Sequence, residues 1–117
     1  MPKSFQLGIA EDLSASYCSD SKLLQCLPLG QNECKKGMKA AVMSCDYRPL
    51  WNEFERKENA GSDYVFDQGV TEAIGKCVGD GFRKGTGVSG EQFDRCMEEY
   101  FLRFRARIRA NIEGLEE

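Results

Sequence analysis

Apolar and polar residues follow a helical period at the start of the chain. The apolar positions that share one helical face are Phe5, Ile9, Ala10, Leu13 and Tyr17. This spacing predicts an amphipathic helix over residues 4–18. A short apolar segment then predicts a second helix near residues 21–27, and Pro28 and Gly30 interrupt the chain after it.

The next two predicted helices differ in regularity. Within residues 31–45 the apolar positions recur at helical spacing, at Cys34, Met38, Ala41, Val42 and Cys45. This is the clearest helical pattern in the first half of the chain. Pro49 suits the first turn of a shorter helix over residues 49–58, and residues 59–65 are predicted to form a loop.

The second half of the chain predicts two longer helices. One covers residues 65–82, with apolar positions Phe66, Val70, Ala73, Ile74, Cys77, Val78 and Phe82. The other covers residues 89–113, with apolar positions Phe93, Cys96, Met97, Tyr100, Phe101, Phe104, Ile108 and Ile112. Ser89 and Gln92 predict a capping box at its start, in which each side chain bonds the other residue's backbone amide. No alternating strand pattern and no internal repeat occurs.

The cysteines change this picture. They are Cys18, Cys26, Cys34, Cys45, Cys77 and Cys96. Six in so short a chain favour a domain stapled by disulfides in an oxidising compartment. Reduced, buried core cysteines in a cytosolic protein are the alternative. The chain has no Cys-x-x-Cys and no histidine, which disfavours both a zinc site and a thiol redox site.

Helix ends limit how these cysteines pair, although spacing alone leaves the connectivity open. Folding the chain back at the turn after the second helix sets Cys26 and Cys34 side by side. It also brings Cys18 and Cys45 together at the far end. An antiparallel hairpin of the last two helices sets the third pair level. The predicted bridges are therefore Cys18–Cys45, Cys26–Cys34 and Cys77–Cys96.

Together these patterns predict one all-α domain over residues 1–117, a small disulfide-stapled bundle of four to five helices. Charged residues make up 30% of the chain and apolar residues 41%, which is ordinary globular composition. The net charge of -3 disfavours nucleic acid as a partner. No apolar run is long enough to span a bilayer, and the first residues lack a signal-peptide pattern, so an exported form is expected to be the mature chain with an added Met.

Catalytic chemistry has few candidates in this sequence. The absence of histidine removes the Ser-His and Cys-His pairs that commonly activate a nucleophile. Residues 85–90 match G-x-G-x-x-G, but they follow a predicted helix rather than a strand, so a loop between helices is the better interpretation than a dinucleotide site. We therefore expect no enzyme activity, no cofactor and no metal.

Two groups of side chains stand out beyond the helical stripes. The first is the series Arg103, Arg105, Arg107 and Arg109. It flanks the last apolar stripe on both sides, and we expect its aliphatic stems to extend over the edge of the core. The second is the aromatic group Tyr47, Trp51 and Phe54. These three form either a satellite core or the anchor of a partner-binding site.

The cysteine motifs carry two resemblances. The motifs are Tyr17-Cys18, Leu24-Gln25-Cys26, Glu33-Cys34, Cys45 and Ile74-Gly75-Lys76-Cys77-Val78-Gly79. Over residues 5–100 they resemble uncharacterised cysteine-rich exported helical proteins of bacteria, which implies a periplasmic or secreted protein. The nested pairs also resemble mitochondrial intermembrane-space proteins with twin Cys-x9-Cys helices, which implies an accessory subunit of a mitochondrial complex. Here seven residues separate Cys18 from Cys26 and ten separate Cys34 from Cys45, whereas that family has nine in both places.

The sequence therefore predicts a non-enzymatic protein-binding protein in the periplasm or outside the cell. An immunity or inhibitor protein that blocks another protein fits this description, because a stapled scaffold without catalytic residues offers its surface for recognition. One alternative is a structural accessory subunit of a larger complex, such as a mitochondrial one. The other is a carrier whose helices enclose a small apolar ligand.

Overall fold

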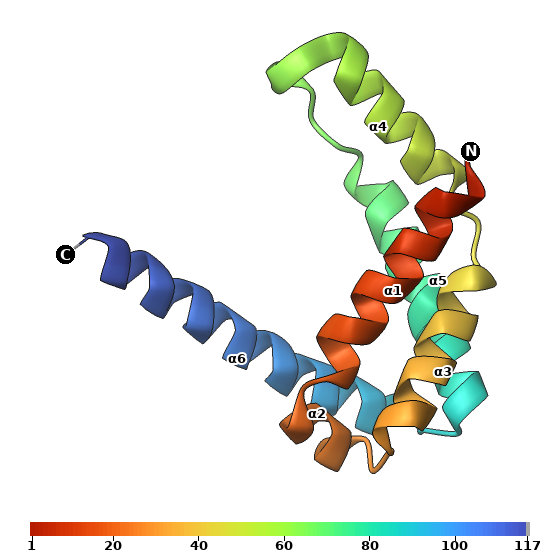
Figure 1. Cartoon of the computed structure of the whole chain (residues 1–117), viewed down its shortest axis with the longest axis vertical. Helices are drawn as coiled ribbons and strands as arrows, with labels where there is room; N and C mark the ends of the chain where they lie inside the picture. The colour runs from red at the N-terminus through yellow and green to blue at the C-terminus, as the bar shows by residue number, and fades with distance from the viewer. Residues whose placement is uncertain (117) are drawn as a thin grey trace.

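The structure is a computed structural model that describes residues 1–116 of the 117-residue chain. Within that range the chain forms six α-helices, one 3₁₀ turn and no strand (Figure 1). The elements are α1 (Lys3–Cys18), α2 (Ser21–Cys26), α3 (Gln31–Met43), α4 (Arg48–Ala60), η1 (Gly61–Asp63), α5 (Gln68–Thr86) and α6 (Gly90–Glu116). The predicted all-α, disulfide-stapled fold is confirmed, with six helices in the described chain rather than four to five.

The largest differences from the predicted helix ends lie around α5. It begins at Gln68 rather than near residue 65, because the Asp67 carboxylate accepts the N–H of Gly69 at 2.8 Å and caps the first turn. It continues past Phe82 to Thr86. Gly87 then adopts the left-handed conformation, with φ at 77°, and ends the helix. The glycine-rich segment is thus a helix end and a turn.

The start of α6 confirms half of the predicted capping box. Ser89 Oγ accepts the backbone N–H of Gln92 at 3.3 Å. The Gln92 side chain, however, donates to the carbonyl of Cys26 at 2.9 Å rather than bonding Ser89. The reciprocal half of the predicted box is therefore wrong, because the side chain is used to hold α6 against the end of α2.

The helices α1, α3 and α5 form a layer in which α3 packs against both of the others and runs antiparallel to them (Figure 1). Small residues bring α3 and α5 close together. A Cβ added to Gly81 would lie 3.3 Å from the Cα of Ala41, and one added to Gly37 would lie 2.7 Å from Cγ2 of Thr86. The residues that this layer buries most completely are Cys18, Cys34, Val42 and Phe82.

The last helix departs from the layer. Figure 1 shows α6 extending away from α1 and α5, so that the molecule has an open angle between α6 and α4. The radius of gyration is 15.9 Å. A compact domain of this length would have a radius of roughly 13 Å. Only the first half of α6 is attached to the other helices, and residues 101–114 form a projecting segment that we call the arm.

The disulfides follow this architecture rather than the order of the chain. They join Cys18 to Cys34, Cys26 to Cys96 and Cys45 to Cys77. All six cysteines are paired, but each predicted partner is different. The predicted bridges Cys18–Cys45, Cys26–Cys34 and Cys77–Cys96 are wrong.

The reason lies in which helices form neighbours. The prediction took consecutive helices to be antiparallel hairpins. Instead α2 turns aside and packs against α6, which brings Cys26 to Cys96. In the same way α5 packs along α3, which brings Cys77 to Cys45, and it meets α6 through Phe93 near the start of that helix. The predicted nesting of Cys26–Cys34 inside Cys18–Cys45, which carried the resemblance to the twin Cys-x9-Cys proteins, therefore does not form.

Candidate binding groove

A long apolar groove lies between α1 and α5, above the middle of the layer. Its volume is about 620 Å³. The wall from α1 consists of Phe5, Ile9, Leu13 and Tyr17, and the wall from α5 includes Ile74, Gly75, Val78, Gly79 and Phe82. Leu50 and Phe54 of α4 lie at one end, and Phe93, Met97 and Phe101 of α6 lie at the other. Met38 of α3 also lines the groove, so five helices contribute to one open apolar surface.

Two features of the sequence create the groove. The apolar face of α1 is broader than α3 can cover, because Ala10, Ser14 and Cys18 are buried while the neighbouring row of larger residues is only half-buried. On the opposite wall, Gly75 and Gly79 supply no side chains. A Cβ added at Gly75 would meet no atom within 4 Å, so the space beside α5 is open there.

The groove offers almost no polar chemistry. Its polar side chains are those of Thr71, Tyr17 and Tyr47, and the hydroxyl of Tyr47 is buried. Burial, together with the neighbouring Tyr100, raises the pKa of Tyr17, and burial raises the pKa of Tyr47 to about 12. Both hydroxyls therefore stay neutral near pH 7. With no carboxylate or cation in its wall, the groove is suited to bind apolar surface.

The aromatic group predicted near the Arg48–Pro49 break divides between core and groove. Tyr47 exposes only 1% of its surface and belongs to the core, which is one of the two alternatives given for this group. Trp51 packs edge-on against Phe5, with 5.0 Å between ring centroids. Phe54 is 41% exposed and remains available at the end of the groove. The half-buried row of α1 was missed because its spacing was interpreted only as core.

A buried carboxylate positions the α4 end of the groove. Glu53 is 3% exposed and accepts hydrogen bonds from the Tyr64 hydroxyl, from Arg56 at 2.9 Å and from the N–H of Asp67 at 3.2 Å. The Tyr64 hydrogen bond, followed by those of Asp67 and Arg56, lowers the pKa of Glu53. Because these bonds tie α4 to the segment before α5, they hold Phe54 beside the groove.

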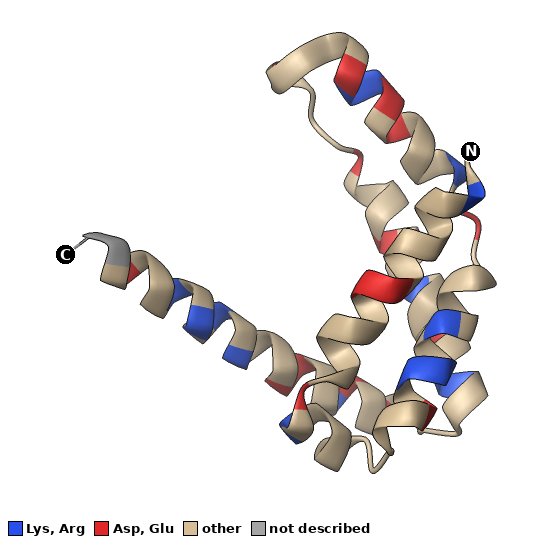
Figure 2. Ribbon diagram, in the orientation of Figure 1, with Lys and Arg blue, Asp and Glu red and all other residues tan. Residues whose placement is uncertain are grey.

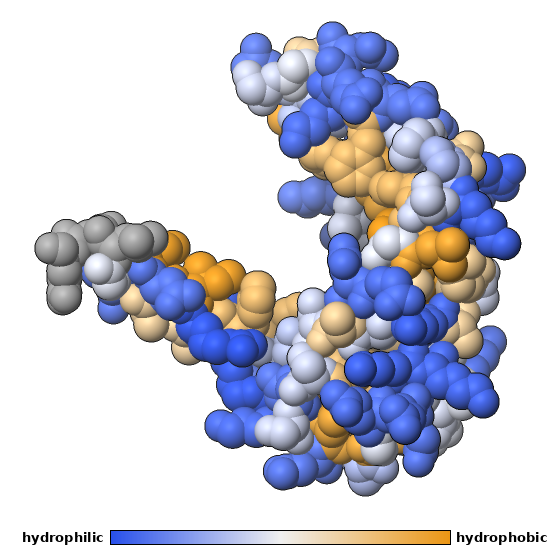
Figure 3. All heavy atoms as spheres, in the orientation of Figure 1, coloured by the Kyte–Doolittle hydropathy of each residue, from blue (hydrophilic) through white to orange (hydrophobic). Residues whose placement is uncertain are grey.

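The arm carries a second uncovered apolar surface. Phe101, Phe104, Ile108 and Ile112 are each between 43% and 52% exposed. They fall on one side of α6, and Figure 3 shows hydrophobic surface on the edge of α6 that faces the open angle. The apolar pattern of the last helix thus continues beyond the end of the core.

Of the four arginines of the arm, Arg103 is partly buried, whereas the other three are exposed and do not lie over the core edge as predicted. Arg103 forms an ion pair at 3.2 Å with Asp20, the residue that caps the start of α2. Arg107 lies over the ring of Phe104 on the arm itself, 6.0 Å from the centroid. Arg105 and Arg109 are exposed. The prediction fails for the last three arginines because the helix leaves the core before them.

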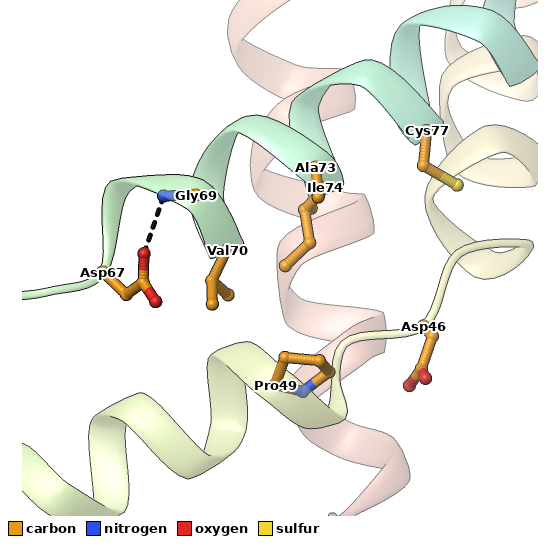
Figure 4. A pocket seen from close by; sticks show the side chains of 8 residues that line it. All are labelled: Asp46, Pro49, Asp67, Gly69, Val70, Ala73, Ile74 and Cys77. Atoms are coloured by element: carbon orange, nitrogen blue, oxygen red, sulfur yellow. Dashed lines mark hydrogen bonds between the residues drawn. The ribbon is translucent and has the colours of Figure 1, made fainter.

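A smaller pocket between α4 and α5 has two carboxylates at its margin (Figure 4). Asp46 accepts two side-chain hydrogen bonds and one backbone hydrogen bond from Arg48, which lower its pKa to about 2. Asp67 caps α5 through Gly69, as the dashed line shows. Both carboxylates therefore have local structural partners, and the pocket presents no pair for acid–base chemistry.

Comparison with known proteins gives no further guide to this groove. No family model matches the chain, and no curated protein or solved structure is significantly similar to it.

Metal sites and membrane-spanning helices are both absent from the described part of the chain. Across residues 1–116, no group of three or more cysteine, aspartate or glutamate side chains is arranged to hold a metal ion. No helix in the same part of the chain is both long enough and apolar enough to cross a membrane.

Proposed function

We propose that this chain is a non-enzymatic binding protein whose groove receives an amphipathic helix of a protein partner. The observation that carries the proposal is the apolar space between α1 and α5, which is open beside Gly75 and is lined by α1 from Phe5 to Tyr17. Residues 5–17 of α1 correspond to about 18 Å at the rise of an α-helix. Recognition of a helix by an apolar groove requires this shape and few polar groups.

The covalent framework supports a role in recognition. Cys18–Cys34 joins α1 to α3, and Cys45–Cys77 joins the end of α3 to α5. The two walls of the groove are therefore linked through the same central helix. A wall held in place loses little conformational freedom on binding, which favours affinity.

Such a protein would block or neutralise its partner, as an immunity or inhibitor protein does. Three disulfides suit the periplasm or the outside of a cell, where such bonds persist. An accessory subunit of a larger assembly would use the same groove, with a neighbouring subunit as the source of the helix.

A matched pair of glycine variants tests the groove. Gly75→Phe places a ring in the open space of the groove, whereas Gly85→Phe places one on the same helix outside it; neither Cβ meets an atom within 4 Å. The probe is a designed peptide helix with an apolar stripe and arginines on its flanks. Fluorescence anisotropy should show binding to the wild type and to Gly85→Phe, at least tenfold weaker binding to Gly75→Phe, and none of a scrambled peptide.

Equal binding by the two variants, or equal binding of the scrambled peptide, would exclude the groove as the site. Circular dichroism of both variants checks that the helices remain folded.

A carrier of a small apolar ligand is the second candidate, because about 620 Å³ lies within the volume range of small-molecule sites. Native mass spectrometry of the protein as purified separates the two functions. A bound hydrophobe that is present on the wild type and on Gly85→Phe but absent from Gly75→Phe would favour the carrier over the helix-binding protein.

A further inference from the structure

We propose that the groove of one chain receives the arm of a second copy, so that two chains form a symmetric dimer with two arm–groove contacts. The inference rests on the proposed function, because it names the helix that the groove takes. It explains two features of the single chain together. In the described chain, the groove between α1 and α5 holds no helix, and the apolar stripe of the arm is not covered by another helix.

The two surfaces match in length and chemistry. The α1 wall from Phe5 to Tyr17 extends about 18 Å, and the arm from Phe101 to Ile112 extends about 16 Å, at the rise of an α-helix. The apolar residues of the arm recur every third or fourth position, which gives the narrow stripe that a groove between two helices accepts. Aromatic and aliphatic side chains line both surfaces.

Charge favours this pairing of surfaces. Residues 53–72, beside the α4 end of the groove, contain six acidic and two basic side chains, which is a net charge of -4. The arm contains four arginines and Glu113, which is a net charge of +3. Figure 2 shows blue segments along the arm and several red ones along α4 and at the start of α5. An arm in a partner's groove therefore brings opposite charges together.

The arm of the same chain is poorly suited to this groove. Reaching it would require a turn within α6, and residues 91–113 contain neither glycine nor proline. Phe101, the first residue of the arm, packs on Tyr17 at the end of its own groove. The continuous helix carries the rest of the arm away from α1 and presents it to another molecule.

Two other occupants of the arm fit less well. Pairing of two arms would place Arg105 and Arg109 of each chain near those of the other, where like charges repel. A bilayer with anionic lipids would attract the arm but meet a chain whose net charge is -3. Either arrangement also leaves the groove uncovered, whereas reciprocal exchange covers both apolar surfaces.

The area is sufficient for a stable dimer. Large side chains bury about 150 to 250 Å² each, so four of them at about half exposure leave roughly 300 to 450 Å² of apolar surface on each arm. Two arms and the two surfaces that cover them would bury roughly 1,200 to 1,800 Å², which is the size of a standard specific interface. Two-fold symmetry makes every contact occur twice.

Sedimentation velocity over a concentration series tests the dimer with variants on both surfaces. The wild type and Gly85→Phe should dimerise. Gly75→Phe, which blocks the groove, and Ile108→Glu, which places a charge on the arm stripe, should each weaken dimerisation at least a hundredfold, because each change acts at both contacts. Ile108 is 43% exposed, so its replacement leaves the core intact.

Mixing the two weakened variants gives the decisive result. Gly75→Phe retains an intact arm, and Ile108→Glu retains an intact groove. The mixture should form a heterodimer through one arm–groove contact, although neither variant dimerises alone at the same concentration. Variants that had simply lost their fold could not restore each other's association.

Other outcomes would overturn the dimer. A monomeric wild type excludes it, and so does dimerisation that Ile108→Glu abolishes while Gly75→Phe leaves it unchanged, which would indicate pairing of two arms. Binding of the monomeric wild type to phosphatidylglycerol vesicles, lost in Ile108→Glu, would assign the arm to a membrane surface.

The designed peptide separates this inference from the proposed function. If the peptide binds Ile108→Glu and Gly75→Phe abolishes that binding, the groove takes helices even where the wild type is monomeric. If the peptide fails to bind and the wild type is monomeric, both proposals fail.

Discussion

Phe82 in α5 and Phe104 in α6 occupy similar positions in the apolar stripes of their helices, but their surroundings differ. Phe82 exposes 1% of its surface within the α1–α3–α5 layer, whereas Phe104 exposes 44% on the arm. A helical period identifies which face of a helix is apolar. The period does not show whether another part of the same chain covers that face. The stripe of the arm is as regular as that of α5, but no other helix of the described chain covers it.

Replacing each phenylalanine by alanine should give the largest difference between the two regions. Phe82→Ala should lower the free energy of unfolding by about 3 to 5 kcal/mol, because it leaves a cavity in the layer. Phe104→Ala should lower the free energy of unfolding by less than about 1 kcal/mol, because the side chain is 44% exposed and makes few contacts that its removal would break. Chemical denaturation in dilute solution measures both. Similar losses for the two variants would show that the arm is packed in the single chain.

The bond between the two regions can also be removed. Replacing both Cys26 and Cys96 by serine opens a bridge with a sequence separation of 70 residues. The free energy of unfolding should fall by about 4 kcal/mol in the loop-entropy description. Hydrogen exchange should then rise in α6 before it rises in α3.

The bridge within the layer provides the control for that experiment. Replacing both Cys45 and Cys77 by serine should lower stability by about 3 to 4 kcal/mol. It should leave hydrogen exchange at the start of α6 unchanged. Faster exchange in α6 for both double variants would contradict the separate attachment of the arm.

A smaller effect, of opposite sign, is expected under the groove. The Tyr47 hydroxyl is buried and has no hydrogen-bond partner among the described residues. Tyr47→Phe removes this uncompensated group and should raise the free energy of unfolding by about 1 kcal/mol. Tyr17→Phe removes the hydroxyl of a half-buried tyrosine in the same groove and serves as the control. A loss of stability in Tyr47→Phe would show that the hydroxyl has a partner in solution.

The smallest effect concerns acid. The hydrogen bonds of Tyr64, Asp67 and Arg56 lower the pKa of Glu53 from 4.5. The unfolded state therefore binds the proton more readily, so this contribution to stability is present above pH 4.5 and lost as the pH falls through the folded pKa. Denaturation midpoints between neutral and acidic pH should decline less steeply in Glu53→Gln than in the wild type. Glu113→Gln on the arm should follow the wild-type curve, and a parallel decline of all three would contradict this role for Glu53.

Local signals in the sequence determined the helices themselves. The stripes of α1, α3, α5 and α6, Pro49 in the first turn of α4 and Ser89 at the start of α6 all act within a few residues. Hydrogen bonds and side-chain contacts at that range depend little on the rest of the chain, so the all-α class and most helix positions follow from the sequence.

Only the tertiary structure decided which helices are neighbours. Packing at Gly81 and Ala41 brings α5 against α3, and the Gln92 hydrogen bond to Cys26 brings α6 against α2. These long-range contacts determine the disulfide partners. They also determine that one row of α1 lines an open groove and that the arm is uncovered. The physical reason is that an apolar stripe is satisfied by any complementary surface, and the choice among surfaces depends on shape and on energies summed over the whole fold.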